Sequence, residues 1–202
     1  MTISKYYGIL IIDLGTIVCY ITELDMIVKD REFKSYTEYK KKMLLYPEAK
    51  LVVIYRKAQH YKKSKNIFLR AFWSLRWLRI RRVAGCQISL DAKIGRGLCL
   101  LHYGTRIIVR AASIGEYCTI GVNVIVGYGK GENGYGAPSI GNRVYIGHNS
   151  SVVGEINIGD NVLIAPNTFV NRDVPSDSIV VGNNEIIHKE YASAPYIDFG
   201  RH

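Results

Sequence analysis

The chain has 202 residues, 48% of them hydrophobic, and its 27 Lys and Arg residues against 17 Asp and Glu residues give a net charge of +10. This apolar content predicts a folded core and excludes a disordered chain. The positive charge favours an anionic partner, such as a polyphosphorylated ligand, a nucleic acid or an anionic membrane surface, or else a solvated basic surface. Four cysteines without a CxxC pair or zinc-type spacing are typical of a reducing cytoplasm.

Residues 1–83 are predicted to form a helical region. An apolar run over residues 6–21 is interrupted by Asp13 and is shorter than a helix that spans a bilayer. We interpret it as a packing or oligomerisation helix or a strand, with a signal peptide as a lesser alternative. Ser35 and Glu38 have the spacing of a capping box, so a helix is expected to begin there.

A second helix is predicted over residues 47–60, because proline suits the first turn of a helix. Its apolar stripe comprises Leu51, Ile54, Tyr55 and Ala58.

A third helix is predicted over residues 64–80. One face is apolar and is formed by Ile67, Phe68, Ala71, Phe72, Leu75 and Leu78. Trp73 and Trp77 lie on one flank, and several arginines are interspersed. Aromatic and arginine side chains together are typical of an interfacial membrane segment, so residues 64–82 are candidates for peripheral membrane contact. The alternative, which we favour, is a helix packed on the rest of the protein or on a neighbouring subunit.

Residues 88–170 carry a six-residue repeat. Its aliphatic positions are Ile88, Ile94, Leu100, Ile108, Ile114, Ile120, Val126, Ile140, Ile146, Val152, Ile158, Ile164 and Val170. A period of six fits neither a helix nor a flat strand, and it is typical of a β-helix whose coils stack their aliphatic side chains inward. Glycine or alanine often follows the aliphatic residue, and we interpret these glycines as residues that permit the corners.

The repeat is interrupted twice. Leu100 and Ile108 are eight residues apart, so two extra residues fall near 102–105. A second interruption contains the glycine-rich segment 127–138. Interruptions of a solenoid form loops on one face, which is often the binding face.

The repeat resembles that of the hexapeptide-repeat acyltransferases. The resemblance implies a left-handed parallel β-helix over residues 84–185, preceded by the helical region and followed by a tail at 186–202. It also implies a homotrimer with active sites between subunits, while the choice between a trimer and a hexamer stays open.

His102 is the candidate catalytic residue. An outward imidazole on a rigid coil suits a general base, although on the residues alone an ordinary surface histidine is the more common case. Residues 88–123 align without a gap on the serine acetyltransferases, and His102 then matches their catalytic histidine. The resemblance implies that His102 takes a proton from an acceptor hydroxyl that attacks the thioester of acetyl-CoA.

Three departures from that family concern the acceptor. Gln87 stands where the family has an aspartate, Leu101 stands where another aspartate precedes the histidine, and Gly136-Ala137-Pro138 replaces a substrate-binding Arg-His-Pro. The arginine that would grip the carboxylate of an amino acid is therefore missing from the loop.

The segment that begins at His102 resembles the polysaccharide or capsule O-acetyltransferase branch of the same family. The resemblance implies a sugar or a surface-polysaccharide precursor as the acceptor. Tyr103, Tyr128 and Tyr135 are the candidate acceptor-binding residues.

Acetyl-CoA is the expected co-substrate, and no metal is expected. Gly127 is the candidate donor to the developing oxyanion, while Lys130 and Lys189 are candidate phosphate contacts. Gly147 and Ala165 would leave room for the pantetheine arm. Solvated lysines, and small residues required only by the corners, are the alternative interpretations.

Other functions remain open. They are serine O-acetylation in cysteine biosynthesis, a zinc carbonic anhydrase, for which His102 and His148 supply too few ligands, and a non-enzymatic trimeric scaffold. Nucleic-acid binding is not expected, because no recognised motif accompanies the basic charge. The expected location is the cytoplasm, with the inner face of the membrane as an option.

Overall fold

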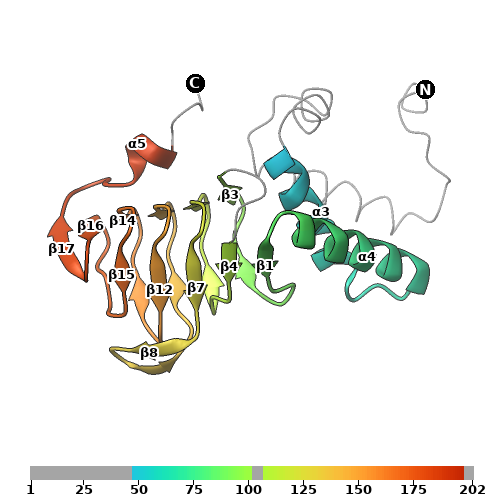
Figure 1. The fold of residues 1–202 in the computed structure, drawn as a ribbon, viewed down its shortest axis with the longest axis horizontal. Coiled ribbons are helices and arrows are strands. Elements are labelled where there is room, and N and C mark those ends of the chain that lie inside the picture. The colour runs from blue at the N-terminus through green and yellow to red at the C-terminus, as the bar shows by residue number, and fades with distance from the viewer. Residues whose placement is uncertain (1–46, 102–106, 198–202) are drawn as a thin grey trace, which may run out of the picture.

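The structure is a computed structural model that describes residues 47–101 and 107–197 (Figure 1). The predictions made for residues 6–21 and for the capping box at Ser35 and Glu38 lie outside the described residues.

Three helices and seventeen strands are described. The helices are α3 (Pro47–Tyr61), α4 (Ile67–Val83) and α5 (Ala194–Ile197). The strands up to the second interruption are β1 (Cys86–Ile88), β2 (Lys93–Ile94), β3 (Cys99–Leu100), β4 (Ile107–Val109), β5 (Ser113–Ile114), β6 (Thr119–Ile120) and β7 (Ile125–Gly127). The later strands are β8 (Gly129–Gly131), β9 (Gly134–Gly136), β10 (Ser139–Ile140), β11 (Tyr145–Ile146), β12 (Ser151–Val153), β13 (Asn157–Ile158), β14 (Leu163–Ile164), β15 (Phe169–Val170), β16 (Ser178–Val181) and β17 (Glu185–His188).

The strands form a three-sided parallel β-helix. Sheet A has the order β1-β4-β7-β12-β15, sheet B has β13-β10-β5-β2, and sheet C has β17-β16-β14-β11-β6-β3. All neighbours in these sheets pair in parallel except β16 and β17, which are antiparallel. Each of the first four coils therefore supplies one short strand to each sheet, and inward aliphatic side chains from successive coils stack into one continuous core.

The first interruption differs from the prediction by one residue. Val109, not Ile108, is the inward residue of β4, because Val109 pairs with Ile88 and Val126 and has no exposed surface. Ile108 instead pairs with Gln87 and Ile125 on the outward positions of sheet A. The interruption therefore inserts three residues, and the turn that follows β4 is one residue shorter than in the other coils. Because the total length is unchanged, the spacing of aliphatic residues in the sequence does not reveal this shift.

The glycines that follow the aliphatic positions serve stacking, in contrast to the role predicted for them at the corners. The left-handed backbone at the corners is adopted by other residues, mostly asparagine, as at Asn149 and Asn167. These asparagines form a ladder, in which Asn149 Nδ2 donates to Asn167 Oδ1 at 3.2 Å. A Cβ at Gly147 would instead lie 2.5 Å from the backbone nitrogen of Pro166 in the next coil. Glycine is therefore required because adjacent coils approach closely.

Helix α3 closes the open end of the β-helix at the first coil. Its predicted apolar stripe is buried as expected. Arg56 is buried and donates from Nη1 to the carbonyl oxygen of Ile94 at 2.8 Å, while Gln59 donates to the carbonyl of Ala92 at 2.9 Å. The Tyr55 hydroxyl donates to the carbonyl of Ser89 at 3.1 Å. These bonds satisfy carbonyls that have no further coil to pair with, so α3 acts as the capping element of the solenoid.

Helix α4 packs through a different face from the one predicted. Trp77 and Ile80 are buried, and the Trp77 ring lies 5.3 Å from that of Tyr55 on α3. The predicted apolar face is turned outward, and Phe68 is 84% exposed. The helix does pack on the rest of the protein, but the tryptophan flank makes the contact because its large rings fill the space beside α3. Among the described residues, no helix is long and apolar enough to cross a bilayer.

Candidate functional site

The two interruptions of the repeat lie at different corners of the β-helix. Residues 102–106 join β3 of sheet C to β4 of sheet A and lie outside the described residues, so the structure does not place His102 or Tyr103. The second interruption joins β7 of sheet A to β10 of sheet B and contains the hairpin β8–β9 (Figure 1). Within one chain, the width of sheet A therefore separates the hairpin from the edge at which β4 begins, and the proposed base precedes β4 in the sequence.

The hairpin is fixed to the later coils by hydrogen bonds. The amide of Glu132 donates to the carbonyl of Asn171 at 2.8 Å, and Asn133 Nδ2 donates to Asp173 Oδ1 at 2.8 Å. Although desolvation opposes the effect, the bonds that Asp173 accepts from the Asn157 amide and from Asn133 hold the pKa of its carboxyl below the usual value. Asp173 thus stays ionised at neutral pH and anchors the hairpin.

The hairpin presents its candidate ligand-binding side chains to solvent. Lys130 and Tyr135 lie on its two strands and are exposed. Tyr128 links β7 to the hairpin and is 67% exposed. Of these three, Tyr128 alone lines the hollow described next.

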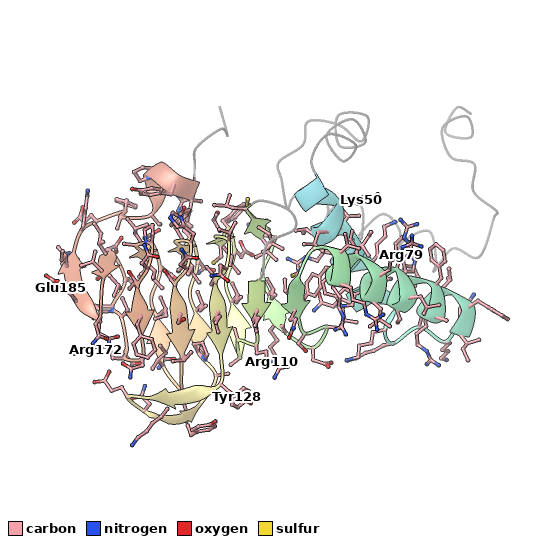
Figure 2. All side chains as sticks on the ribbon, viewed as in Figure 1. Lys50, Arg79, Arg110, Tyr128, Arg172 and Glu185 are labelled. Carbon is pink, nitrogen blue, oxygen red and sulfur yellow. The ribbon has the colours of Figure 1, made fainter. Side chains whose placement is uncertain are left out.

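A hollow of about 790 Å³ lies between the end of α4, the first two coils and Tyr128. Its lining residues are Arg81, Arg82, Gly85, Cys86, Gln87, Ile88, Ser89, Asp91, Ala92, Arg110, Ala111 and Tyr128. Gln87 points outward from β1 into this hollow, so the residue that replaces the family's aspartate does line a cavity. Figure 2 shows Arg110 near Tyr128, on the edge from which the hairpin projects.

The hollow has an excess of positive charge that the sequence interpretation missed. Arg81 and Arg82 come from the last turn of α4, and Arg110 follows β4. The carboxylate of the lining, Asp91, accepts a hydrogen bond from Lys62 and is paired with it. No spacing rule connects residues 81 and 110, so only the packing of α4 on the first coil brings these arginines together.

The cofactor-binding candidates do not form one cluster within a chain. Gly127 and Lys130 lie at the corner between sheets A and B, whereas Gly147 and Ala165 directly follow neighbouring strands of sheet C. Lys189 follows β17, and its side chain is exposed. If these residues bind one ligand, more than one chain must contribute them.

The reason for a glycine differs between positions 127 and 147. Packing against the next coil requires Gly147, as described above. A Cβ at Gly127 would meet no atom within 4 Å. The space beside Gly127 is therefore open to a ligand, and packing alone does not explain the glycine.

His148 lies at the corner between sheets C and A, the same corner as the first interruption, and is exposed. Among the described ranges, no three His, Cys, Asp or Glu side chains are grouped so that they could hold a metal ion. Burial raises the pKa of the Cys118 thiol to about 12, so Cys118 is an ordinary buried thiol.

The sequence matches one family model and many curated proteins. The family model, "Bacterial transferase hexapeptide (six repeats)", matches residues 137–172. A serine acetyltransferase of Helicobacter pylori is 37% identical over 143 residues, which cover 70% of this chain and 81% of that protein. A serine acetyltransferase of Synechococcus elongatus is 33% identical over 141 residues, which cover 69% of this chain and 56% of that protein.

Solved structures show the same architecture. Serine acetyltransferase of Neisseria gonorrhoeae superposes with a TM-score of 0.60 at 25% identity, over 94% of this chain and 71% of that chain. The soybean enzyme has a TM-score of 0.68 at 24% identity, over 86% of this chain and 72% of that chain. These likenesses confirm the predicted fold class, a left-handed parallel β-helix preceded by a helical region.

Proposed function

Since the chain belongs to the hexapeptide-repeat transferases of the serine acetyltransferase family and is an acyltransferase, we propose that it transfers acetyl from acetyl-CoA to an acceptor hydroxyl with His102 as the general base. The observation that carries the proposal is the 37% identity to a serine acetyltransferase of which this chain covers 81%. The open space beside Gly127 supports it, because packing leaves that space free for a ligand.

The proposed reaction requires the β-helix mainly to position the reacting groups. Acetyl-CoA supplies an activated thioester. His102 takes the proton from the acceptor hydroxyl as its oxygen attacks the thioester carbon, and returns that proton to the departing sulfur. The amide of Gly127 donates to the oxygen on which negative charge develops, and Lys130 and Lys189 contact the phosphates of the co-substrate.

The first candidate acceptor is L-serine. The curated relatives described above are both named serine acetyltransferase, and so is the Neisseria gonorrhoeae protein. The comparisons therefore support this alternative better than the polysaccharide or capsule O-acetyltransferases, which the sequence interpretation placed first.

The second candidate acceptor is a hydroxyl of a sugar or of a surface-polysaccharide precursor. Two observations favour it: the segment Gly136-Ala137-Pro138 carries no cationic side chain, and the hollow beside Tyr128 has a volume of about 790 Å³. Sites of such a volume hold ligands much larger than a single amino acid.

Thiol release from acetyl-CoA tests the proposal. We expect release that depends on an added acceptor, measured with L-serine and in parallel with nucleotide sugars and oligosaccharides. Release with L-serine alone would establish the first candidate, and release with a sugar alone would establish the second. If no acceptor in either group promotes release, while the Helicobacter pylori enzyme as a positive control is active with L-serine, the proposed activity is wrong.

A homotrimer would complete the site. The hairpin and the first interruption lie at opposite edges of sheet A in one chain, so the hairpin of a neighbouring subunit would have to approach His102. Outward apolar side chains on sheet A, including Ile125 and Phe169, support an interface on this face.

We propose that α4 makes peripheral contact with an anionic membrane, which would place the enzyme at the membrane surface. The outward face of α4 carries Phe68 and Leu75, and the helix has five arginines and no acidic residue. We expect the protein to sediment with vesicles that contain phosphatidylglycerol and not with phosphatidylcholine vesicles. Phe68→Asp should weaken this binding at least tenfold, whereas Ile187→Asp, at an exposed position of β17, should not. Equal binding to both kinds of vesicle, or none, would contradict the proposal.

A further inference from the structure

We propose that Arg81, Arg82 and Arg110 form an anion-binding site that holds a phosphate or carboxylate group of the acceptor. The inference rests on the proposed function and adds the class of acceptor: a molecule with a negatively charged group near the hydroxyl that receives the acetyl group. The site is the hollow between the end of α4, the first two coils and Tyr128.

The three arginines come from two distant parts of the sequence. Arg81 and Arg82 lie in the last turn of α4, where a positive charge also stabilises the helix dipole. That explanation does not extend to Arg110, which follows strand β4 and is exposed. The convergence of all three on one hollow is therefore a property of the fold.

No carboxylate in the described part of the chain forms an ion pair with these arginines. Among the residues that the structure describes, no ion pair or side-chain hydrogen bond involves Arg81, Arg82 or Arg110. The carboxylate in the lining, Asp91, is already paired with Lys62. Arginine binds phosphate and carboxylate through paired N–H donors, so a hollow lined by three such groups is suited to an anion.

The hollow also offers neutral contacts for the rest of an acceptor. Gln87 supplies an amide that can donate and accept, and Tyr128 supplies an exposed ring with a hydroxyl group. The segment Gly136-Ala137-Pro138 at the end of the hairpin has no cation. The positive charge for an acceptor would thus come from α4 and β4 in place of the hairpin.

The hollow lies apart from two of the candidates for coenzyme A binding, Ala165 and Lys189, whereas Gly127 and Lys130 flank Tyr128 at its edge. The hollow lies on the first two coils beside α4. Ala165 and Lys189 lie toward the other end of the β-helix, after β14 and β17. We assign the three arginines to the acceptor, and saturating coenzyme A in the binding test distinguishes this assignment from a contact with the phosphates of the co-substrate.

Calorimetric titration of the full chain tests the assignment, with saturating coenzyme A present throughout. The probes are UDP for a phosphate group, L-serine and D-glucuronate for a carboxylate group, and D-glucose as the uncharged control. We expect UDP, one of the carboxylates, or both to bind, and glucose not to bind. The probe that binds shows whether the charged group of the acceptor is a phosphate or a carboxylate.

Matched variants then locate the binding. Arg110→Gln and Arg82→Gln should each weaken the responding probe at least tenfold, the effect of losing one charge-assisted hydrogen bond. Arg172→Gln removes the same charge at an exposed position outside the hollow and should leave binding unchanged. No binding of any charged probe in the presence of coenzyme A, or equal binding by all the variants, would overturn the proposal.

The binding assay does not depend on turnover. Arginine-dependent binding by a protein that transfers no acetyl group would support the anion site and contradict the proposed function. If the protein transfers acetyl groups, and the Arg110→Gln and Arg82→Gln variants bind the probe as tightly as the unchanged protein does, the result would support the function and contradict the anion site.

Discussion

Replacing His102 with alanine is expected to lower kcat/KM for acetyl transfer by on the order of 10²- to 10⁴-fold, because the acceptor hydroxyl loses its general base. The free energy of unfolding should change little, since the resemblance places His102 outward from the coil. Thiol release measures the first quantity, and urea unfolding measures the second. Loss of activity accompanied by loss of folding would not support a catalytic role, and unchanged activity would contradict it.

Mixing inactive subunits tests whether the site spans two chains. His102→Ala chains and Arg110→Gln chains should each have low activity alone. After unfolding and refolding together, the proposed trimers would include some interfaces in which both residues are intact, so part of the activity should return. If the mixture is no more active than the average of its parts, the residues act within one chain and the proposed intersubunit site is wrong.

Replacing Trp77 with alanine is expected to lower the free energy of unfolding by about 3–5 kcal/mol, because it empties a large buried site between α3 and α4. Trp77 is 2% exposed and contacts Tyr55, which itself bonds to the first coil. The variant should therefore loosen the cap of the β-helix as well as α4. Equilibrium urea unfolding measures the effect.

Phe68→Ala is the matched control on the same helix. Phe68 is 84% exposed, so its removal should change the free energy of unfolding by no more than about 0.5 kcal/mol. A larger loss for Phe68→Ala than for Trp77→Ala would mean that the predicted apolar face, and not the tryptophan face, is the packed face of α4.

The sequence predicts the β-helix well because its signal is repeated. Each coil must present an aliphatic residue to the same narrow core, so one wrong position does not obscure the pattern. The interruption before Val109 shows the limit of this reasoning. Ile108 and Val109 are equally suitable core residues by type, and only the pairing of Val109 with Ile88 and Val126 decides between them.

The orientation of α4 could not be predicted from its sequence. An apolar face and a tryptophan flank lie on the same helix, and amphipathicity alone favours the broader apolar face. The outcome depends on α3, whose Tyr55 leaves a space that the Trp77 ring fills. The role of Arg56 could not be predicted for the same reason. Its buried guanidinium donates hydrogen bonds to carbonyls of a coil that begins about thirty residues later in the sequence.

The candidate site was predictable only in part. Gly127, Lys130 and Tyr128 could be found because they surround a visible interruption of the repeat. No sequence signal identifies Arg82 and Arg110, since neither belongs to a motif. They line the same hollow only because of the way α4 packs on the first coil. The assignment of His102 rests on resemblance, and it stays a prediction.

The most direct test of acetyl transfer is product analysis. The protein is incubated with acetyl-CoA and the acceptor that promotes most thiol release, and the acceptor is then examined by mass spectrometry. The proposed function predicts one acetyl group on an acceptor hydroxyl for each thiol released. Thiol release without an acetylated acceptor would mean hydrolysis of acetyl-CoA, and would contradict the assignment of this chain as an O-acetyltransferase.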